Sequence, residues 1–304
     1  MASTPFYDFT ISLFPVALRK SLPLHLLTWQ AGVTPLSTLT SISAAIVVYL
    51  GTIFGIQALM RGRAPFGKEG CFKLAFLVHN VALTIGSALL LGCMLEEIWP
   101  IFRERGLFYA ICGAGAWTMR METFYIINFY FKFWELIDTI FLVLKKKPLQ
   151  FLHVYHHSAT ALLCFSQLHG HTSVSWVVIC LNLAVHVLMY FYYALTSLKI
   201  PCPWKKAVTT SQIVQFVIDL FVVYFASYNY AANTYLPWLP HVGTCAGAEY
   251  AAISGCVCLT SYLFLFIAFY QRTYKKAANA RAKAAANGKA LANGYSNGSI
   301  KKAQ

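Results

Sequence analysis

The chain has 304 residues, of which 58% are hydrophobic and 11% are charged, and its formal net charge is +14. Because a soluble domain carries about 25% charged residues, this composition excludes an ordinary soluble protein and predicts a membrane protein. The basic residues lie in short segments between apolar stretches and in a C-terminal tail, which argues against a nucleic-acid partner.

Seven apolar stretches predict transmembrane helices, each of which needs about 20 residues. In chain order they cover residues 37–60, 72–95, 120–144, 149–168, 174–197, 208–231 and 248–271. We therefore predict an all-α, polytopic membrane protein with about seven transmembrane helices in residues 37–271. An N-terminal segment, 1–36, precedes this domain, and a basic tail, 272–304, follows it and is expected to be disordered. The glycine-interrupted stretch 106–118 is expected to be re-entrant or interfacial, which leaves six to eight spans open.

Lysine and arginine residues predict the orientation, since cytosolic loops are enriched in them. With seven spans, one side of the membrane carries the tail and most of the basic loop residues: Arg61, Arg63, Lys68, Lys145, Lys146, Lys147, Lys199, Lys205 and Lys206. We predict that this side is cytosolic and that the N-terminus is lumenal. The last four residues, KKAQ, match the dilysine retrieval signal of endoplasmic reticulum membrane proteins, a receptor-read address, and predict that location.

Four consecutive spans carry polar residues, which are costly inside a membrane and mark function by default. The span 120–144 contains KFWELIDT, with Lys132, Glu135, Asp138 and Thr139. Lys132 and Glu135 are three residues apart, so they share a helix face and can pair their charges. The alternative is a charge pair that only anchors the helix near the membrane surface.

The next span begins with FLHVYHHSATALLCF, which places His153, His156 and His157 on one helix face. A single buried histidine is often a hydrogen-bonded core residue. Three histidines on one face instead favour a functional site.

The fifth and sixth spans continue the pattern. NLAVHVLMYFYY carries a stripe formed by Asn182, His186, Met189, Tyr190 and Tyr193. TTSQIVQFVID carries a stripe formed by Thr209, Gln212, Gln215 and Asp219. Aromatic packing and interhelical hydrogen bonding are the structural alternatives. At a rise of about 1.5 Å per residue, all four stripes fall in the predicted cytosolic half of the membrane. We therefore predict one polar chamber inside a helix bundle, open toward the cytosol, with the other spans as apolar walls.

Two other classes of protein were considered for this chamber. Membrane di-iron desaturases and hydroxylases also use HxxHH, and imidazole suits iron, but they need further histidine boxes that are missing from these nine histidines. A transporter with a proton relay would often show an internal repeat, and none is seen here. The third possible function of the chamber is nucleophilic and acid–base catalysis by imidazole.

The nine cysteines lack metal-binding spacing, and most lie inside spans, where a thiol behaves as a small apolar residue. Cys245 falls in a predicted lumenal loop. Cys93 and Cys112 are predicted on the same side of the membrane as Cys245. A disulfide with either is therefore possible, and the sequence leaves both open.

The four motifs resemble, in the same order, those of the ELO family of very-long-chain fatty-acid elongases. KFWELIDT fits KxxExxDT, HVYHH fits HxxHH, NLAVHVLMYFYY fits NxxxHxxMYxYY and TTSQIVQ fits TxxQxxQ. No motif position departs from these patterns. The resemblance covers roughly residues 55–275, and the text around HVYHH looks like the fungal branch.

The resemblance implies a reaction in which a long-chain acyl-CoA condenses with malonyl-CoA to 3-ketoacyl-CoA, CoA and carbon dioxide. This is the first step of the elongation cycle of the endoplasmic reticulum, and it implies no cofactor and no metal. The expected partners, besides the lipid bilayer, are a ketoacyl reductase, a dehydratase and an enoyl reductase. Whether the protein forms a homodimer is left open.

The resemblance also implies roles for the histidines. His156 is expected to be the nucleophile of a ping-pong route through an acyl-imidazole, since a neutral imidazole can attack a thioester near neutral pH. His186 is expected to activate it or to serve the second half-reaction. His153 and His157 are expected to orient groups, form hydrogen bonds or transfer protons.

The other motif residues are expected to support this chemistry. Lys132 is expected to balance Glu135 and Asp138 or to neutralise the malonyl carboxylate. Hydrogen bonds to the developing oxyanion are expected from three amides, Asn182, Gln212 and Gln215. The supporting set is completed by Thr139, Met189, Tyr190 and Tyr193. The CoA phosphates are expected near the basic loop residues Lys145, Lys146, Lys147, Lys199, Lys205 and Lys206. The alternative is that these lysines only reflect the enrichment of basic residues in cytosolic loops.

Overall fold

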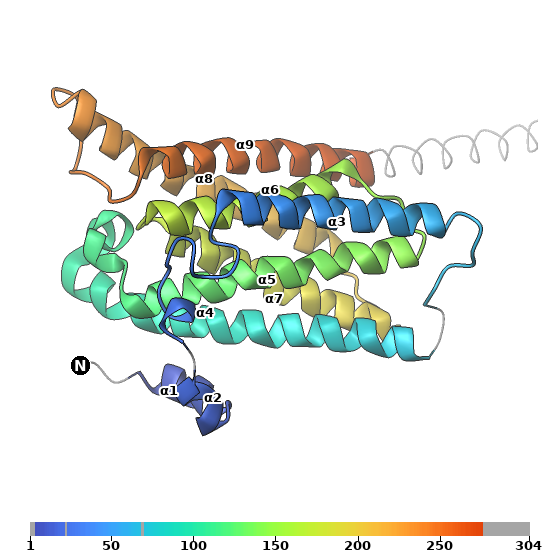
Figure 1. The fold of residues 1–304 in the computed structure, drawn as a ribbon. Coiled ribbons are helices and arrows are strands. Elements are labelled where there is room, and N and C mark those ends of the chain that lie inside the picture. Colours follow the sequence, from blue (N-terminus) through green and yellow to red (C-terminus); the bar gives the residue numbers. More distant parts are fainter. Residues whose placement is uncertain (1–3, 22, 68–69, 276–304) are drawn as a thin grey trace, which may run out of the picture.

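The computed structural model describes residues 4–21, 23–67 and 70–275, and seven long helices make up most of this part of the chain (Figure 1). They are α3 (Leu39–Leu59), α4 (Cys71–Cys112), α5 (Met119–Leu144), α6 (Phe151–Gly170), α7 (Ser175–Ser197), α8 (Lys205–Tyr235) and α9 (Glu249–Tyr270). Shorter helical elements are α1 (Pro5–Ser12), α2 (Val16–Ser21) and the turns Leu24–Leu26, Ala114–Ala116 and Gln271–Lys275. The predicted all-α architecture is confirmed.

Each of the seven predicted spans overlaps one of the seven long helices, and α4 extends beyond the predicted 72–95 to Cys112. Five of them, α3, α4, α7, α8 and α9, are long and apolar enough to cross a membrane. Helices α5 and α6 are less apolar because they carry the charged motif and the three neighbouring histidines. Such helices are tolerated in a bilayer when their polar side chains face the interior of the bundle, and that is where these side chains lie.

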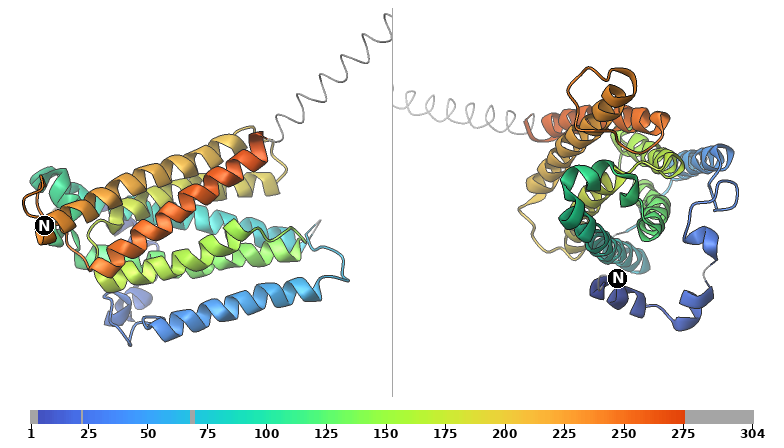
Figure 2. Two further views of the ribbon diagram at one scale, coloured as in Figure 1. Left: turned by 90° about the horizontal axis from the view of Figure 1, so that it is seen from above. Right: turned by 90° about the vertical axis from the view of Figure 1, so that its left-hand side faces the viewer.

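Six of the described helices form a closed ring, in the order α4, α5, α6, α9, α8 and α7. Helix α7 packs against α4 and closes the ring, while α3 lies outside it against α5 and α6. The view along the bundle in Figure 2 shows α3 set apart from the ring in this way. The ring brings the four helices that carry the polar stripes around one interior.

The long helix α4 bends near its C-terminal end. Pro100 lies within the helix, where it lacks a backbone donor, and Gly106 has a φ of 79°, which glycine adopts without the steric cost of a side chain. The helix then resumes and ends at Cys112. The stretch 106–118 is therefore the end of α4 and a short turn before α5, and it adds no further span.

The outer surface of the helices is apolar, as a lipid-facing surface must be. Large side chains such as Phe221, Phe264 and Val47 are among the most exposed residues of the described chain. Exposed apolar surface of this extent is a liability in water and is favourable in hydrocarbon. The interior in turn holds buried polar residues, which belong to the site described below.

The two ends of the bundle differ in chemistry. One, the basic end, has the loops 60–67, 145–150 and 198–204. The other, the disulfide end, has the loops 113–118 and 236–248 and is crossed by the Cys112–Cys245 disulfide. Of the two partners that the sequence left open for Cys245, the structure selects Cys112, whereas Cys93 is free and buried inside the bundle. Lys68 and the KKAQ terminus lie outside the described residues.

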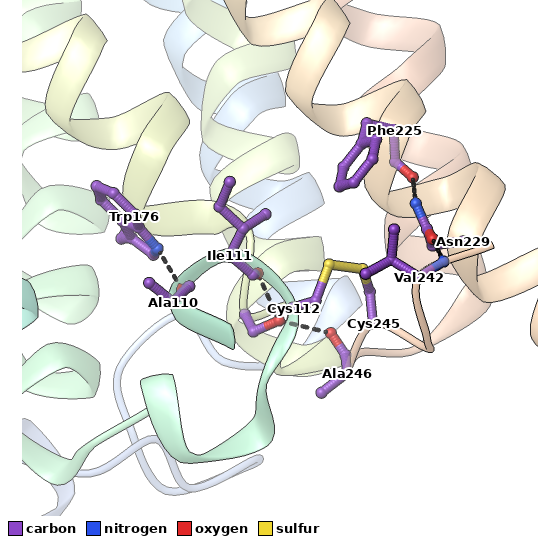
Figure 3. The surroundings of a disulfide bond; sticks show 10 residues. Ala110, Ile111, Cys112, Trp176, Phe225, Asn229, Val242, Cys245 and Ala246 are labelled. Atoms are coloured by element: carbon purple, nitrogen blue, oxygen red, sulfur yellow. Dashed lines mark hydrogen bonds between the residues drawn. A yellow bond between two sulfur atoms is a disulfide. The ribbon is translucent and has the colours of Figure 1, made fainter. Parts of the chain in front are cut away.

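The disulfide is part of a strap, residues 242–248, that fastens the α8–α9 loop across this end (Figure 3). The backbone N–H of Ala246 donates to the carbonyl of Cys112 at 2.8 Å, and the N–H of Val242 donates to Asn229 Oδ1 at 2.9 Å. The strap is thus tied to both α4 and α8. Gly247 has a φ of 138°, and a β-carbon there would collide with Thr172 at 2.7 Å, so the close approach requires glycine.

Candidate active site

A long cavity runs through the interior of the ring. Toward the basic end its lining includes Lys132, His156, Asn182 and Gln215. Toward the disulfide end it is lined by the strap, from Cys245 to Ala248. Most of the wall between is apolar, with residues such as Leu163, Phe216, Val223 and Leu259. A hydrocarbon chain with a polar head fits this division into one polar and one apolar part.

A buried polar cluster joins α5 to α7 at the polar part of the cavity. Lys132 Nζ donates to Glu135 Oε1 and to Asn182 Oδ1, both at 2.8 Å. Lys132 and Glu135 are only 3% and 4% exposed, so this ion pair is inside the bundle and does not anchor a helix at the surface. His186 Nδ1 lies 3.2 Å from Glu135 Oε1, and His186 Nε2 lies 3.3 Å from Asn182 Nδ2. If Asn182 Nδ2 donates to Nε2, the ring proton of a neutral His186 lies on Nδ1, on the side of the Glu135 carboxylate, where Nδ1 makes no hydrogen bond to a described residue.

The three histidines of α6 lie together but have different neighbours. His153 Nε2 is 2.9 Å from Thr139 Oγ1, and its ring centroid is 4.4 Å from that of His157. The ring of His156 packs against Tyr262, at 4.7 Å between centroids, on α9. Of the three, His156 lines the cavity, whereas the other two are not among its lining residues. The predicted single face is therefore divided, with one histidine at the cavity.

His156 is placed for chemistry as well as for packing. Its Nδ1 is buried and has no hydrogen-bond partner among the described residues. Lys132 and Asn182, two members of the α5–α7 cluster, line the same cavity. The structure thus brings the α6 histidine and the α5–α7 cluster to one site, and it leaves a ring nitrogen of His156 free.

A second polar network lies behind this cluster and includes a histidine that the sequence analysis left unassigned. Asp138 Oδ1 is 2.7 Å from His79 Nε2, and Asp138 Oδ2 accepts a hydrogen bond from the Tyr190 hydroxyl at 2.7 Å. The Tyr190 ring packs edge-on against His186, with 5.4 Å between centroids. His79 could have been found from the sequence, because it is an ionisable residue inside a span and such residues are functional candidates by default.

The helices expected to be purely apolar walls also contribute polar atoms. His79 enters from α4, and the Tyr49 hydroxyl enters from α3 and lies 2.7 Å from Thr139 Oγ1. The prediction of apolar walls is therefore wrong at these two positions. The reason is that the polar stripes of α5 face two directions, and each direction needs a buried partner.

The motif on α8 lies partly in the site. Gln215 lines the cavity and donates from Nε2 to Asp219 Oδ2 at 3.0 Å. Gln212 Nε2 instead contacts the sulfur of Met189 at 3.5 Å, and Gln212 is not among the cavity residues. Thr209 is farther toward the basic end, bonded to the hydroxyl of Tyr274 at 3.1 Å. Tyr193 is 37% exposed and lies at the outside of the stripe.

The lysines of the basic end have varied surroundings. Lys145 Nζ lies 3.1 Å from the centroid of the Phe76 ring, and burial lowers the pKa of its ammonium group. Lys146 Nζ donates to the carbonyl oxygens of Arg61 and Arg63 and so ties two loops together. The exposed lysines of this end are Lys146, Lys147, Lys199, Lys205 and Lys206.

Within the described part of the chain, no three histidine, cysteine, aspartate or glutamate side chains are arranged to hold a metal ion. The cavity lining offers an imidazole with a free nitrogen, the ammonium group of Lys132 and amides. The carboxylate of Glu135 and the imidazole of His186 are not among the lining residues and lie beside Lys132 and Asn182. Such groups can perform nucleophilic and acid–base steps.

Comparison with known proteins shows the family to which the chain belongs. Residues 34–282 match the GNS1/SUR4 (ELO) family. The proteins named "Putative fatty acid elongase 1" and "Putative fatty acid elongase 2" of Schizosaccharomyces pombe are 48% and 42% identical to the chain, over 85% and 89% of it and over 76% and 72% of their own lengths. "Fatty acid elongase sre1" of Dictyostelium discoideum is 37% identical over 64% of the chain and 72% of its own length. The chain therefore belongs to the GNS1/SUR4 (ELO) family of multi-pass membrane proteins and is a fatty acid elongase with the condensing function of that family.

Proposed function

We propose that the protein condenses a long-chain acyl-CoA with malonyl-CoA to 3-ketoacyl-CoA, CoA and carbon dioxide through an acyl-imidazole on His156. The observation that carries this proposal is the position of His156. It is the α6 motif histidine that lines the cavity, its Nδ1 is without a partner among the described residues, and Lys132 lines the same cavity. Its place between the polar and apolar parts of the cavity is where the thioester of a bound acyl-CoA would lie.

In the first half-reaction, a ring nitrogen of His156 attacks the thioester carbonyl. The carbon–sulfur bond breaks, the acyl group remains on the imidazole, and CoA leaves as a thiolate that takes up the proton lost by the ring. Lys132 and the amide of Asn182 are the donors that line the cavity near His156 and can stabilise the oxyanion. Because the Lys132 ammonium has three N–H donors and two are used within the cluster, one remains for the substrate.

In the second half-reaction, malonyl-CoA loses carbon dioxide and the resulting enolate carbon attacks the acyl-imidazole carbonyl. The carbon–nitrogen bond breaks, the 3-ketoacyl-CoA is released and the imidazole of His156 takes a proton from His186, which recovers one from water. His186 is the proposed acid–base group, since its ring lies between Glu135, 3.2 Å from Nδ1, and Asn182, which lines the cavity. His153 and His157 are proposed to orient the α6 motif, with His153 held by Thr139.

The proposed substrate orientation follows from the two ends of the bundle. The CoA phosphates would lie at the basic end, where Lys147, Lys205 and Lys206 are exposed, and the acyl chain would extend toward the strap. We also propose that the basic end faces the cytosol in the endoplasmic reticulum membrane, where the other enzymes of the elongation cycle would take the product. The distribution of basic loop residues supports this orientation.

The test is to incubate the purified protein with a long-chain acyl-CoA in the absence of malonyl-CoA and to measure its intact mass. We expect one acyl group per chain, mapped to His156, with release of an equal amount of CoA. The variant His156→Ala should give no adduct, whereas His169→Ala, at the disulfide end of the same helix, should give the wild-type adduct. If condensation occurs after malonyl-CoA is added but no adduct forms before, the imidazole route is wrong and the histidines act only as acids and bases. If neither adduct nor product forms with any chain length, the proposed reaction is wrong.

A further inference from the structure

A buried carboxyl group on α8 has no place in the mechanism above. Asp219 is 0% exposed, and its Oδ1 has no hydrogen-bond partner among the described residues. No ion pair of the described residues includes it. An unpaired polar atom in the interior of a membrane protein lowers stability, and ionisable residues at such positions are retained for function by default.

The single hydrogen bond of Asp219 leads to the cavity. Asp219 lies four residues after Gln215, so the two side chains share one face of α8. Gln215 Nε2 donates to Asp219 Oδ2 at 3.0 Å, and both residues are buried. Gln215 lines the same cavity as His156, whereas Asp219 does not line it. Asp219 therefore lies behind Gln215 and reaches the site only through it.

We propose that Asp219 is a positioning residue that fixes the amide of Gln215, with the NH₂ group turned toward Asp219 and the carbonyl oxygen turned toward the cavity. The two ends of an amide have opposite hydrogen-bonding character, so an unfixed Gln215 would present a donor or an acceptor. Gln215 Oε1 makes no hydrogen bond to a described side chain or backbone group, and it is free to accept one from the cavity. The proposed reaction supplies a donor there, the ring N–H of His156.

This assignment changes the role expected for Gln215 from the sequence. A donor to the oxyanion would have to turn its NH₂ group toward the substrate, and that group is bound to Asp219. An acceptor beside an imidazole instead holds the ring proton on one nitrogen and leaves the other nitrogen as the nucleophile. The inference rests on the proposed function and adds to it the group that selects the reactive nitrogen of His156.

The test compares two substitutions of similar size. The substitution Asp219→Leu removes both the hydrogen bond to Gln215 and the unpaired oxygen. We therefore expect a thermal unfolding temperature in detergent that is equal to or above that of the wild type. At the same time kcat for condensation should fall by about tenfold or more, since small misplacements of catalytic groups have effects of this size, and KM for the acyl-CoA should stay within about twofold. Asp219→Asn keeps an acceptor for Gln215, and its kcat should stay within about threefold of the wild type.

A double-mutant cycle shows whether Asp219 acts through Gln215. We expect Asp219→Leu to have no further effect on kcat when it is combined with Gln215→Leu. Ser87→Ala is the matched control, because the Ser87 hydroxyl on α4 is also buried without a partner among the described residues. Its removal should leave kcat unchanged.

Three results would overturn the inference while the wild type remains an active condensing enzyme. The first is an Asp219→Leu variant with kcat within twofold of the wild type. The second is a folded Asp219→Asn variant as slow as Asp219→Leu, which would mean that the carboxyl group itself reacts. The third is an equal loss from Asp219→Leu with and without Gln215. Absence of condensation by the wild type would instead overturn the proposed function.

Discussion

Replacing Lys132 by methionine removes one half of the buried ion pair and keeps most of the side-chain volume. Lys132 Nζ contacts Glu135 Oε1 and Asn182 Oδ1 at 2.8 Å, and both members of the ion pair are nearly inaccessible. A buried carboxylate without its partner costs about 3–5 kcal/mol, and the amide oxygen without its donor adds about 1–3 kcal/mol. Folded proteins are stable by about 5–15 kcal/mol, so Lys132→Met should lose a large part of the unfolding free energy and all condensation activity.

The assay is thermal unfolding of the purified protein in detergent, together with condensation of an acyl-CoA with labelled malonyl-CoA. The double variant Lys132→Met/Glu135→Gln carries no buried charge at this position, so it should recover most of the lost stability and remain inactive. Lys73→Met, outside the cluster, is the control and should change neither quantity. The reasoning is refuted if the double variant unfolds at the same temperature as the single variant, because the loss would then have another source than an unpaired carboxylate.

Three further predictions concern the cavity, the second network and the strap. Gly255→Leu places a side chain in the cavity that Gly255 lines, so the longest product found by gas chromatography should shorten by at least one two-carbon step; an unchanged product range would contradict this. His79→Phe keeps a ring but removes the bond to Asp138, and it should lower the unfolding free energy by about 1–3 kcal/mol and slow condensation, whereas wild-type values in both assays would show that the bond is dispensable. Loss of the disulfide between Cys112 and Cys245 in a double alanine variant should cost about 2–4 kcal/mol, and thermal unfolding that is insensitive to its removal would argue against the strap as a stabilising element.

The positions of the helices could be predicted because each depends on a local property of the chain. An uninterrupted apolar run of bilayer length forms a helix that satisfies its own backbone hydrogen bonds. The order of the helices around the ring could not be predicted in this way. It depends on packing between segments distant in sequence, such as α4 against α7 and α6 against α9, and no periodicity within one helix encodes it.

The site was predictable where several polar residues recur on one helix face. The contact between Lys132 and Glu135 follows from their spacing of three residues, and the structure shows it. His79 was missed because it is a single histidine in a span that carries no family motif, and its partner Asp138 is on another helix. The partner of Cys245 was left open for a similar reason. Cys93 and Cys112 are both on α4 and nineteen residues apart, and only the extension of the helix to its end at Cys112 shows which one reaches the loop.

The position of the strap has a consequence for how substrates enter the cavity and how products leave it. Residues 245–248 line the cavity at the disulfide end, so in the proposed orientation the strap lies at the methyl end of the acyl chain. If the strap closes this end to substrates, each chain has to enter and leave through the basic end. Product and the next substrate would then exclude each other, and a long product that leaves slowly would act as a competitive inhibitor of its own synthesis.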